Sequence, residues 1–256
     1  MKKINIAFTL VLLLPALIAF AIVKPKTKAI ATIDDITGGF AVVELFTSEG
    51  CSSCPSADAV IAKIEKEMAD KPVYILAYHV DYWNRLGWKD VFSSADYSRR
   101  QSTYAGWLNL RSVYTPQVIV NGKTEFVGSR ESALRSAIQK GLEKNSKASI
   151  AINRINTDGN RLKFSYVTNT IAGNNLLVAL IKKTAVSAVK QGENNGRILH
   201  HVQIVNSLQN ILLTNKNGEG NITLPTGFLA PEYEVIAFVQ RANTGEIIAA
   251  TRGVIN

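Results

Sequence analysis

The sequence predicts an α/β domain followed by an all-β domain whose antiparallel strands form a sandwich. Two observations carry this prediction. In the first half, short apolar runs alternate with amphipathic helical patterns, which is typical of β-α-β units. In the second half, short strands separated by turn signals follow one another closely, which is typical of an antiparallel sandwich. The chain has 256 residues, a length compatible with two domains.

The α/β domain is predicted over residues 37–144. Its first strand is the short, apolar and β-rich segment Phe40–Phe46, which has the composition of a buried central strand. The segment Pro55–Ala69 has apolar residues at helical spacing, and Pro55 suits the first helical turn. A second strand at Val73–Tyr78 completes a β-α-β unit, whose two strands must be parallel.

A long aromatic insertion is predicted over residues 79–110. It contains all three tryptophans and a predicted helix from Ser94, its N-cap, to Leu108. Its aromatic residues either line a substrate groove or form a satellite core that holds the insertion in place. They are Tyr82, Trp83, Trp88, Tyr97, Tyr104 and Trp107.

Beyond the insertion, a β run meets Asn121-Gly122, a strong signal for a two-residue hairpin turn. A helix over Ser129–Leu142 closes the domain. A polar connector around Lys140–Lys147 then leads to the sandwich domain, predicted over residues 148–256. Its strands are predicted at Ala148–Arg154, Arg161–Val167, Leu176–Ile181, Ile198–Val205, Asn221–Leu224, Tyr233–Gln240 and Glu246–Arg252.

The N-terminus has the three parts of a secretory signal peptide. Two lysines precede an apolar stretch from Ile4 to Val23, and small residues favour cleavage after Ala21. Residues 1–21 are therefore the predicted signal peptide and residues 22–36 a linker. An uncleaved membrane anchor is the alternative, because the stretch approaches the length that spans a bilayer. We expect a periplasmic or secreted protein with no stable membrane association after cleavage.

Composition and charge exclude several classes of partner. Hydrophobic residues make up 46% and charged residues 19% of the chain, as in a globular protein. The net charge of +9 is spread along the chain, without the interleaved basic and aromatic residues of a nucleic-acid groove. We therefore expect no nucleic-acid partner. We predict no cofactor, and the sequence leaves the oligomeric state open.

The only two cysteines, Cys51 and Cys54, have the spacing that permits a reversible disulfide. Placed between a strand and a helix, such a pair has one thiol near a helix N-terminus, where the macrodipole and free amides stabilise its thiolate. Cys51 is then the nucleophile, and Cys54 resolves the mixed disulfide. The alternative is a permanent structural disulfide. Such a small loop stabilises little by constraining the unfolded chain, which favours the redox interpretation.

The order of these elements resembles the thioredoxin fold. The motif Val113-Tyr-Thr-Pro116 is similar to its cis-proline loop, and Glu44 resembles its buried acid, with one extra residue before the first cysteine. The resemblance implies that Thr115-Pro116 is cis and binds an extended substrate peptide beside Cys51. It also implies that Glu44 exchanges protons with Cys54. The alternative for Glu44 is a strand-end carboxylate paired with a basic neighbour.

Three longer motifs are similar to a bacterial secreted family catalogued as domain of unknown function 1223. This resemblance covers nearly the whole mature chain and implies a thioredoxin-like fold without an established reaction. The motifs are Glu44-Leu-Phe-Thr-Ser-Glu-Gly-Cys-Ser-Ser-Cys-Pro, His79-Val-Asp-Tyr-Trp and Gly192-Glu-Asn-Asn-Gly-Arg197. The last of them lacks the context of a phosphate loop and is interpreted as a hairpin or an interdomain contact.

Histidines add further alternatives. His79 could tune the thiolate, could join Cys51 and Cys54 in a soft copper or zinc site, or could hydrogen-bond within the aromatic insertion. A closed zinc site needs four ligands, and only three candidates are visible. His200 and His201 are adjacent in a predicted strand, must face opposite ways, and are interpreted as structural.

These patterns favour an exported thiol-disulfide oxidoreductase that acts on the thiols or disulfides of envelope proteins. Cys51, Cys54 and Glu44 are its predicted catalytic residues. Thr115, Pro116 and Trp83 are its predicted substrate-binding residues. One alternative is a non-enzymatic envelope binding protein with a structural disulfide. The other is a copper-handling chaperone that uses Cys51, Cys54 and His79.

Overall fold

The structure is a computed structural model that describes residues 38–255. The predicted signal peptide and the predicted linker lie outside the described residues. Among the described residues, no helix has both the length and the apolar character needed to cross a membrane.

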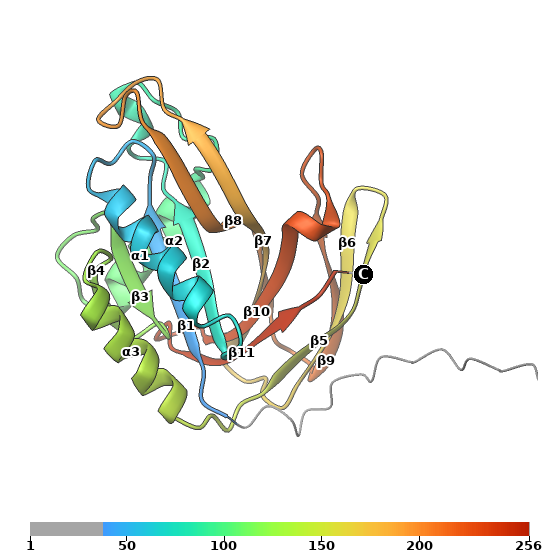
Figure 1. The fold of residues 1–256 in the computed structure, drawn as a ribbon. Helices are drawn as coiled ribbons and strands as arrows, with labels where there is room; N and C mark the ends of the chain where they lie inside the picture. Colours follow the sequence, from blue (N-terminus) through green and yellow to red (C-terminus); the bar gives the residue numbers. More distant parts are fainter. Residues whose placement is uncertain (1–37, 256) are drawn as a thin grey trace, which may run out of the picture. The chain divides into compact units, whose positions relative to one another are not determined.

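One eight-stranded sheet runs through the molecule (Figure 1). Strand β1 lies beside β2 in parallel and beside β3 in antiparallel orientation, so the predicted β-α-β unit is present. The strands, in spatial order, are β11 (Ile247–Gly253), β10 (Tyr233–Arg241), β7 (Asn174–Ala188), β8 (Ile198–Leu212), β2 (Val73–His79), β1 (Ala41–Thr47), β3 (Gln117–Val120) and β4 (Thr124–Val127).

Helices cover both faces of the β1 end of this sheet. Val43 and Leu45 point to one face, where they share a core with α1 (Cys54–Glu67) and α3 (Glu131–Glu143). Val42 and Phe46 point to the other face, where α2 (Ala95–Trp107) packs. This alternation follows from the two-residue period of a strand. It decides which side chains of β1 can face the N-terminus of α1.

Two local sequence signals mark the start of α2 and the connection between β3 and β4. The Ser94 hydroxyl accepts a hydrogen bond from the Asp96 amide, so Ser94 caps α2 as the sequence predicts. Asn121 and Gly122 both have positive φ, at 49° and 68°. Three residues, 121–123, connect β3 to β4, one more than the two-residue turn that the sequence predicts, because Val120 pairs with Thr124. Within residues 38–255, two short 3-10 helices, η2 (Asn84–Leu86) and η3 (Ala230–Glu232), add to the three α-helices.

All seven strands predicted in the second half are present, but four of them extend the large sheet. Strands β7, β8, β10 and β11 are joined to the α/β part through β8, where Ile204 pairs with Ala77 of β2. The other three, β5 (Ile150–Asp158), β6 (Arg161–Thr168) and β9 (Asn217–Thr223), form a separate sheet.

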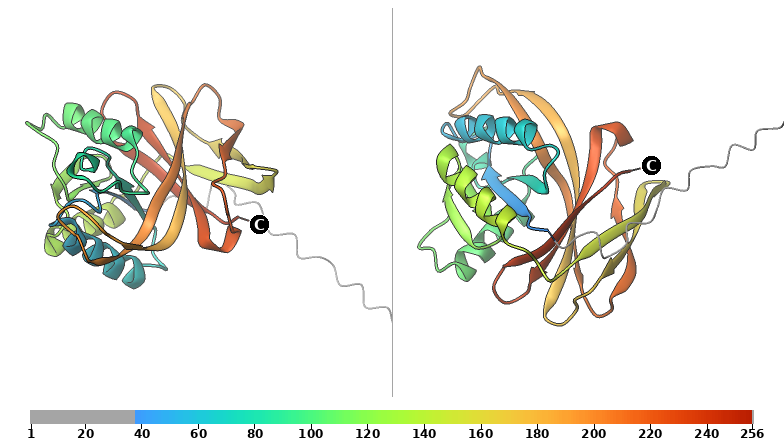
Figure 2. Two further views of the ribbon diagram at one scale, coloured as in Figure 1. Left: turned by 90° about the horizontal axis from the view of Figure 1, so that it is seen from above. Right: turned by 60° about the horizontal axis from the view of Figure 1, so that its bottom comes forward.

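The three-stranded sheet shares an apolar core with β7, β10 and β11 of the large sheet (Figure 2). The architecture is therefore mixed α/β, with an α/β part over residues 38–143 and a β-rich part over residues 150–253. Residues 144–149 connect α3 to β5, and the predicted domain boundary in this segment stays a prediction. The alternation of apolar and polar residues in β8 indicates which side chains are buried. It does not indicate that β8 pairs with the edge of β2 instead of with strands of a separate sandwich.

Candidate functional site

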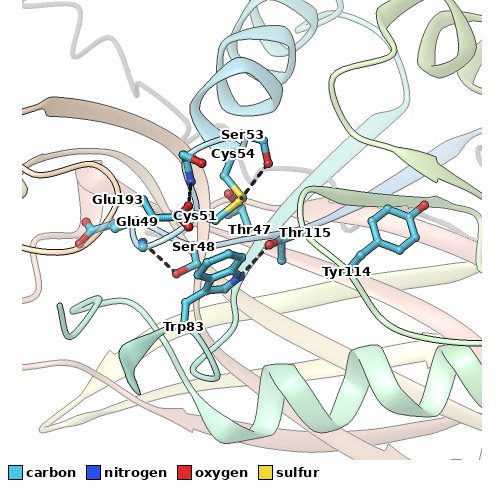
Figure 3. Close-up of a disulfide and its surroundings, with 12 residues drawn as sticks. Thr47, Ser48, Glu49, Cys51, Ser53, Cys54, Trp83, Tyr114, Thr115 and Glu193 are labelled. Carbon is cyan, nitrogen blue, oxygen red and sulfur yellow. Dashed lines mark hydrogen bonds between the residues drawn. A yellow bond between two sulfur atoms is a disulfide. The ribbon is translucent and has the colours of Figure 1, made fainter. Parts of the chain in front are cut away.

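The two cysteines lie between β1 and α1 and form a disulfide (Figure 3). Their Cα atoms are 5.4 Å apart, and Cys54 is the first residue of α1. Pro55 occupies the first turn, where its missing amide leaves no hydrogen bond unmade. The side chains of Cys51 and Cys54 are only 1% and 0% exposed. A substrate sulfur can therefore reach Cys51 only when neighbouring side chains move.

The predicted substrate-binding residues come together beside this disulfide. The Trp83 indole Nε1 donates a hydrogen bond of 2.8 Å to the Thr115 hydroxyl (Figure 3). The Thr115–Pro116 peptide bond is cis, as the resemblance to thioredoxins implies. Pro116 Cβ and the Cβ of Ala57 in α1 both lie within 3.3 Å of the position that a Cβ on Gly128 would occupy. The loop of Thr115 and Pro116 thus lies against the first turns of α1.

The tip of the β7–β8 hairpin, residues 189–197, reaches the cysteine loop from the β-rich part. Buried Asn194 donates hydrogen bonds to the carbonyl oxygens of Glu49, at 2.8 Å, and Cys51, at 2.9 Å. The Glu193 carboxylate accepts one from the Ser52 amide at 2.9 Å, and its hydrogen bonds to Ser52 lower the pKa of Glu193. The motif Gly192–Arg197 is therefore a hairpin contact, as predicted.

Glu44 lies on the face of β1 that points away from α1. Its carboxylate pairs with Arg100 of α2 at 2.6 Å and accepts a hydrogen bond from the Tyr104 hydroxyl. Burial lowers the pKa of Arg100, but the charge and hydrogen bond of Glu44, together with Tyr104 and Tyr78, raise it overall. Of the two sequence interpretations, the structure shows the carboxylate paired with a basic neighbour. The proton-transfer role of Glu44 stays a prediction.

A buried polar cluster fills the α1 face beside the cysteine loop, and we name it the acid–histidine cluster. Its five ionisable members come from β1–α1, β2, the aromatic insertion and β8. They are Glu49, Asp58, His79, Asp90 and His201. Only Asp58 retains noticeable side-chain exposure, at 10%.

Within the cluster, His79 Nδ1 and Asp90 Oδ2 are 2.7 Å apart. Burial lowers the pKa of His79, but the charge and hydrogen bond of Asp90, together with the charges of Asp58 and Glu49, raise it overall. Burial raises the pKa of Asp90, but the charge and hydrogen bond of His79, together with backbone hydrogen bonds from Glu49 and Phe92, lower it overall. Both shifts favour the charged pair. Of the three interpretations of His79, the structure shows hydrogen bonding within the insertion.

His201 lies between two carboxylates of the same cluster. Its Nε2 is 3.4 Å from Glu49 Oε1, and its Nδ1 is 3.7 Å from Asp58 Oδ2. The neighbouring His200 is exposed, so the two histidines face opposite ways as predicted. No sequence motif connects His201 with the cysteines. The one local indication of a polar site is Asp58, which follows Cys54 by one helical turn and contacts His201 in the structure.

The three residues considered for a soft metal site, Cys51, Cys54 and His79, make other contacts in this structure. The two sulfur atoms are bonded to each other, and His79 Nδ1 contacts Asp90. Across residues 38–255, the structure contains no group of three or more His, Cys, Asp or Glu side chains that could hold a metal ion.

Most aromatic residues of the insertion pack into the core on the α2 face of the large sheet, and two tryptophans reach the cysteine site. Tyr97 and Tyr104 are buried in the core on the α2 face, and Tyr82, Trp83 and Trp107 pack against it. Trp83 reaches Thr115, and Trp88 donates a hydrogen bond from Nε1 to Glu49 Oε2 at 2.7 Å. The insertion therefore holds two residues next to the cysteines, Thr115 and Glu49, through hydrogen bonds from its tryptophans.

Comparisons with known proteins agree with this geometry. A thioredoxin of Methanocaldococcus jannaschii is 31% identical over 101 residues, which cover 39% of this chain and 94% of the thioredoxin. The crystal structure of an Agrobacterium tumefaciens protein matches with a TM-score of 0.63 and 26% identity, over 83% of this chain and 92% of that one. The model of the family described as "Protein of unknown function (DUF1223)" matches residues 42–240. The chain therefore belongs to the DUF1223 family, within the thioredoxin-like superfamily.

Proposed function

We propose that the protein is an exported thiol-disulfide oxidoreductase that acts on proteins of the cell envelope. The observation that carries this proposal is the Cys51–Cys54 disulfide at the N-terminus of α1, beside the loop of Thr115 and Pro116. A helix N-terminus stabilises a thiolate, and a thiolate is the form of cysteine that attacks a disulfide. The similarity to a thioredoxin supports the same chemistry.

The reaction uses both cysteines in turn. In the reduced protein, the Cys51 thiolate attacks a substrate disulfide, whose S–S bond breaks as one substrate sulfur leaves as a thiolate. Cys54 then loses its proton and attacks Cys51 Sγ, which forms the Cys51–Cys54 bond and releases the second substrate sulfur as a thiolate. The substrate gains two electrons and the protein loses two. The reverse sequence oxidises a substrate dithiol.

The surrounding residues position the substrate. Trp83 orients Thr115 through its indole hydrogen bond, so an extended peptide can lie along Thr115 and Pro116 next to Cys51. Both carboxylate oxygens of Glu44 accept hydrogen bonds from residues of α2. We therefore propose that Glu44 stabilises the position of the insertion that contains Trp83.

An activity assay tests the proposal. The mature chain is assayed for reduction of insulin by dithiothreitol and for oxidation of a reduced model peptide, together with Cys51→Ser. Ser102→Ala, an exposed change on α2, is the matched control. We expect wild type and control to exceed Cys51→Ser at least tenfold in one of the two assays. Equal rates for wild type and Cys51→Ser in both assays would refute the proposal.

The redox midpoint separates this function from a structural disulfide. Equilibration with glutathione buffers should give a midpoint within the range of exchange proteins, above about −300 mV. A midpoint far below that value would identify a permanent bridge and favour the non-enzymatic binding protein.

A further inference from the structure

The acid–histidine cluster lies where a proton acceptor for Cys54 is needed. Asp58 follows Cys54 by four residues in α1, and side chains at this spacing are neighbours on one helix face. Asp58 Oδ1 accepts a hydrogen bond of 3.1 Å from the Thr47 hydroxyl, which comes from the last residue of β1. The carboxylate of Asp58 is thereby held beneath the cysteine loop.

The hydrogen bonding of the cluster is incomplete. Both ring nitrogens of His201 and Glu49 Oε1 are buried without a hydrogen-bond partner, as is His79 Nε2. Buried polar atoms of this kind destabilise a fold, so their presence calls for an explanation. Stability alone does not supply it.

His201 has a carboxylate near each ring nitrogen, Glu49 on one side and Asp58 on the other. In its neutral form an imidazole has one N–H and one acceptor nitrogen, so it can donate to only one of two carboxylates. A proton on Asp58 would let Asp58 donate to the second ring nitrogen. The cluster is therefore built to accept a proton from a neighbouring group.

The neighbouring group that releases a proton is Cys54. We propose, on the basis of the proposed function, that Asp58 accepts the Cys54 thiol proton during resolution and returns it when the disulfide is reduced, with His201 positioning and stabilising Asp58. The S–H bond of Cys54 breaks, its proton goes to Asp58, and its electron pair forms the bond to Cys51 Sγ. The S–S bond between Cys51 and the substrate breaks, and the substrate sulfur leaves as a thiolate with the electron pair of that broken bond.

The charges around Asp58 suit a proton acceptor. Burial raises the pKa of Asp58, although the nearby charges of His201 and His79 and the Thr47 hydroxyl act against it. Asp90, across the cluster, adds to the rise. Glu49, in the loop after β1, lies near the Nε2 atom of His201, whereas Asp58 lies near its Nδ1 atom. A carboxyl group with a raised pKa holds a proton more readily near neutral pH than an exposed one does.

Asp58 and Glu44 lie on opposite sides of β1. Val43 and Leu45, the neighbours of Glu44 in β1, pack in the core that contains α1, so Glu44 must point away from α1. Asp58 lies on α1 itself. Its role can therefore be tested independently of the Glu44–Arg100 pair.

A two-step reaction tests the proposal. The reduced protein is mixed with dithiobis(nitrobenzoic acid): attack by Cys51 releases the first coloured thiolate, and resolution by Cys54 releases the second. We expect Asp58→Asn to slow the second release about 100-fold near neutral pH and to leave the first within about twofold, as loss of a general base does. The deficit should shrink as pH rises, because hydroxide then deprotonates Cys54, and Asp58→Glu should recover part of the rate.

Matched variants make the outcome decisive. Asp70→Asn, an exposed change just beyond α1, should leave both releases unchanged. An unchanged second release in folded Asp58→Asn, or equal slowing of both releases, would overturn the proposal. If Asp58→Asn does not fold, His201→Asn decides: selective slowing of the second release supports the proposal, and equal or absent slowing rejects it. Failure of wild type in the insulin and peptide assays, by contrast, would reject only the proposed function.

Discussion

The two faces of β1 hold buried charges in opposite ways. On the α2 face, Glu44 has Arg100 and Tyr104 as partners, and Gln240 donates a further hydrogen bond to the Tyr104 hydroxyl. On the α1 face, the acid–histidine cluster leaves nitrogen and oxygen atoms without partners. Both oxygens of the Glu44 carboxylate have partners, although the buried Tyr78 hydroxyl near Arg100 has none. Both ring nitrogens of His201 lack partners, and unpaired buried polar atoms cost free energy. We therefore propose a structural role for the Glu44–Arg100 pair and a proton-accepting role for the acid–histidine cluster.

Breaking the α2-face pair should have the largest effect on stability. Arg100→Met leaves the buried Glu44 charge without its partner, which should cost about 3–5 kcal/mol of unfolding free energy in urea. The added change Glu44→Gln should recover much of this loss, because it removes the uncompensated charge. Arg99→Met, which breaks the exposed pair with Asp96, is the control and should cost no more than about 1 kcal/mol. Similar losses for the two single variants would contradict a structural Glu44–Arg100 pair.

Removing the hairpin contact should have an intermediate effect. Asn194→Ala leaves the carbonyl oxygens of Glu49 and Cys51 without their donor, which should cost about 1–3 kcal/mol in unfolding free energy. The disulfide should also react faster with dithiothreitol, because the tip no longer holds the cysteine loop. Exposed Asn195→Ala in the same tip is the control. An unchanged reduction rate in Asn194→Ala would show that the tip does not restrict access to Cys51.

The pH dependence of stability should show the smallest effect. The raised pKa of His79 means that its contribution is fully present below its unfolded pKa of about 6.5 and is lost as pH rises through the folded value. The lowered pKa of Asp90 contributes above about 3.9 and is lost as pH falls through the folded value.

The Tm of wild type should therefore decline as the pH rises above neutral, and His79→Asn should flatten this decline. Replacing exposed His200 with Asn should leave that decline intact. Parallel Tm profiles for wild type and His79→Asn would show that the His79–Asp90 pair contributes no pH-dependent stability.

The sequence was most informative where a signal is local. The cap at Ser94 and Pro55 in the first turn of α1 each depend on a few neighbouring residues, and the structure confirms both. Asn121-Gly122 lies between β3 and β4 as expected, in a connection of three residues. The cis Thr115–Pro116 bond followed from the resemblance to thioredoxins. The His201 contacts did not follow, because Glu49 and His201 are brought together by pairing between β2 and β8.

The sequence by itself determined the elements and the chemistry that the chain can offer: a cysteine pair at a helix start, with Asp58 one turn beyond. Only the tertiary structure decided that β7 and β8 extend the large sheet, that Glu44 faces α2, and that His201 meets Asp58. The physical reason is that periodicity and capping act over a few residues of chain. Which strand edges pair, and which buried charges meet, depends on the packing of distant segments.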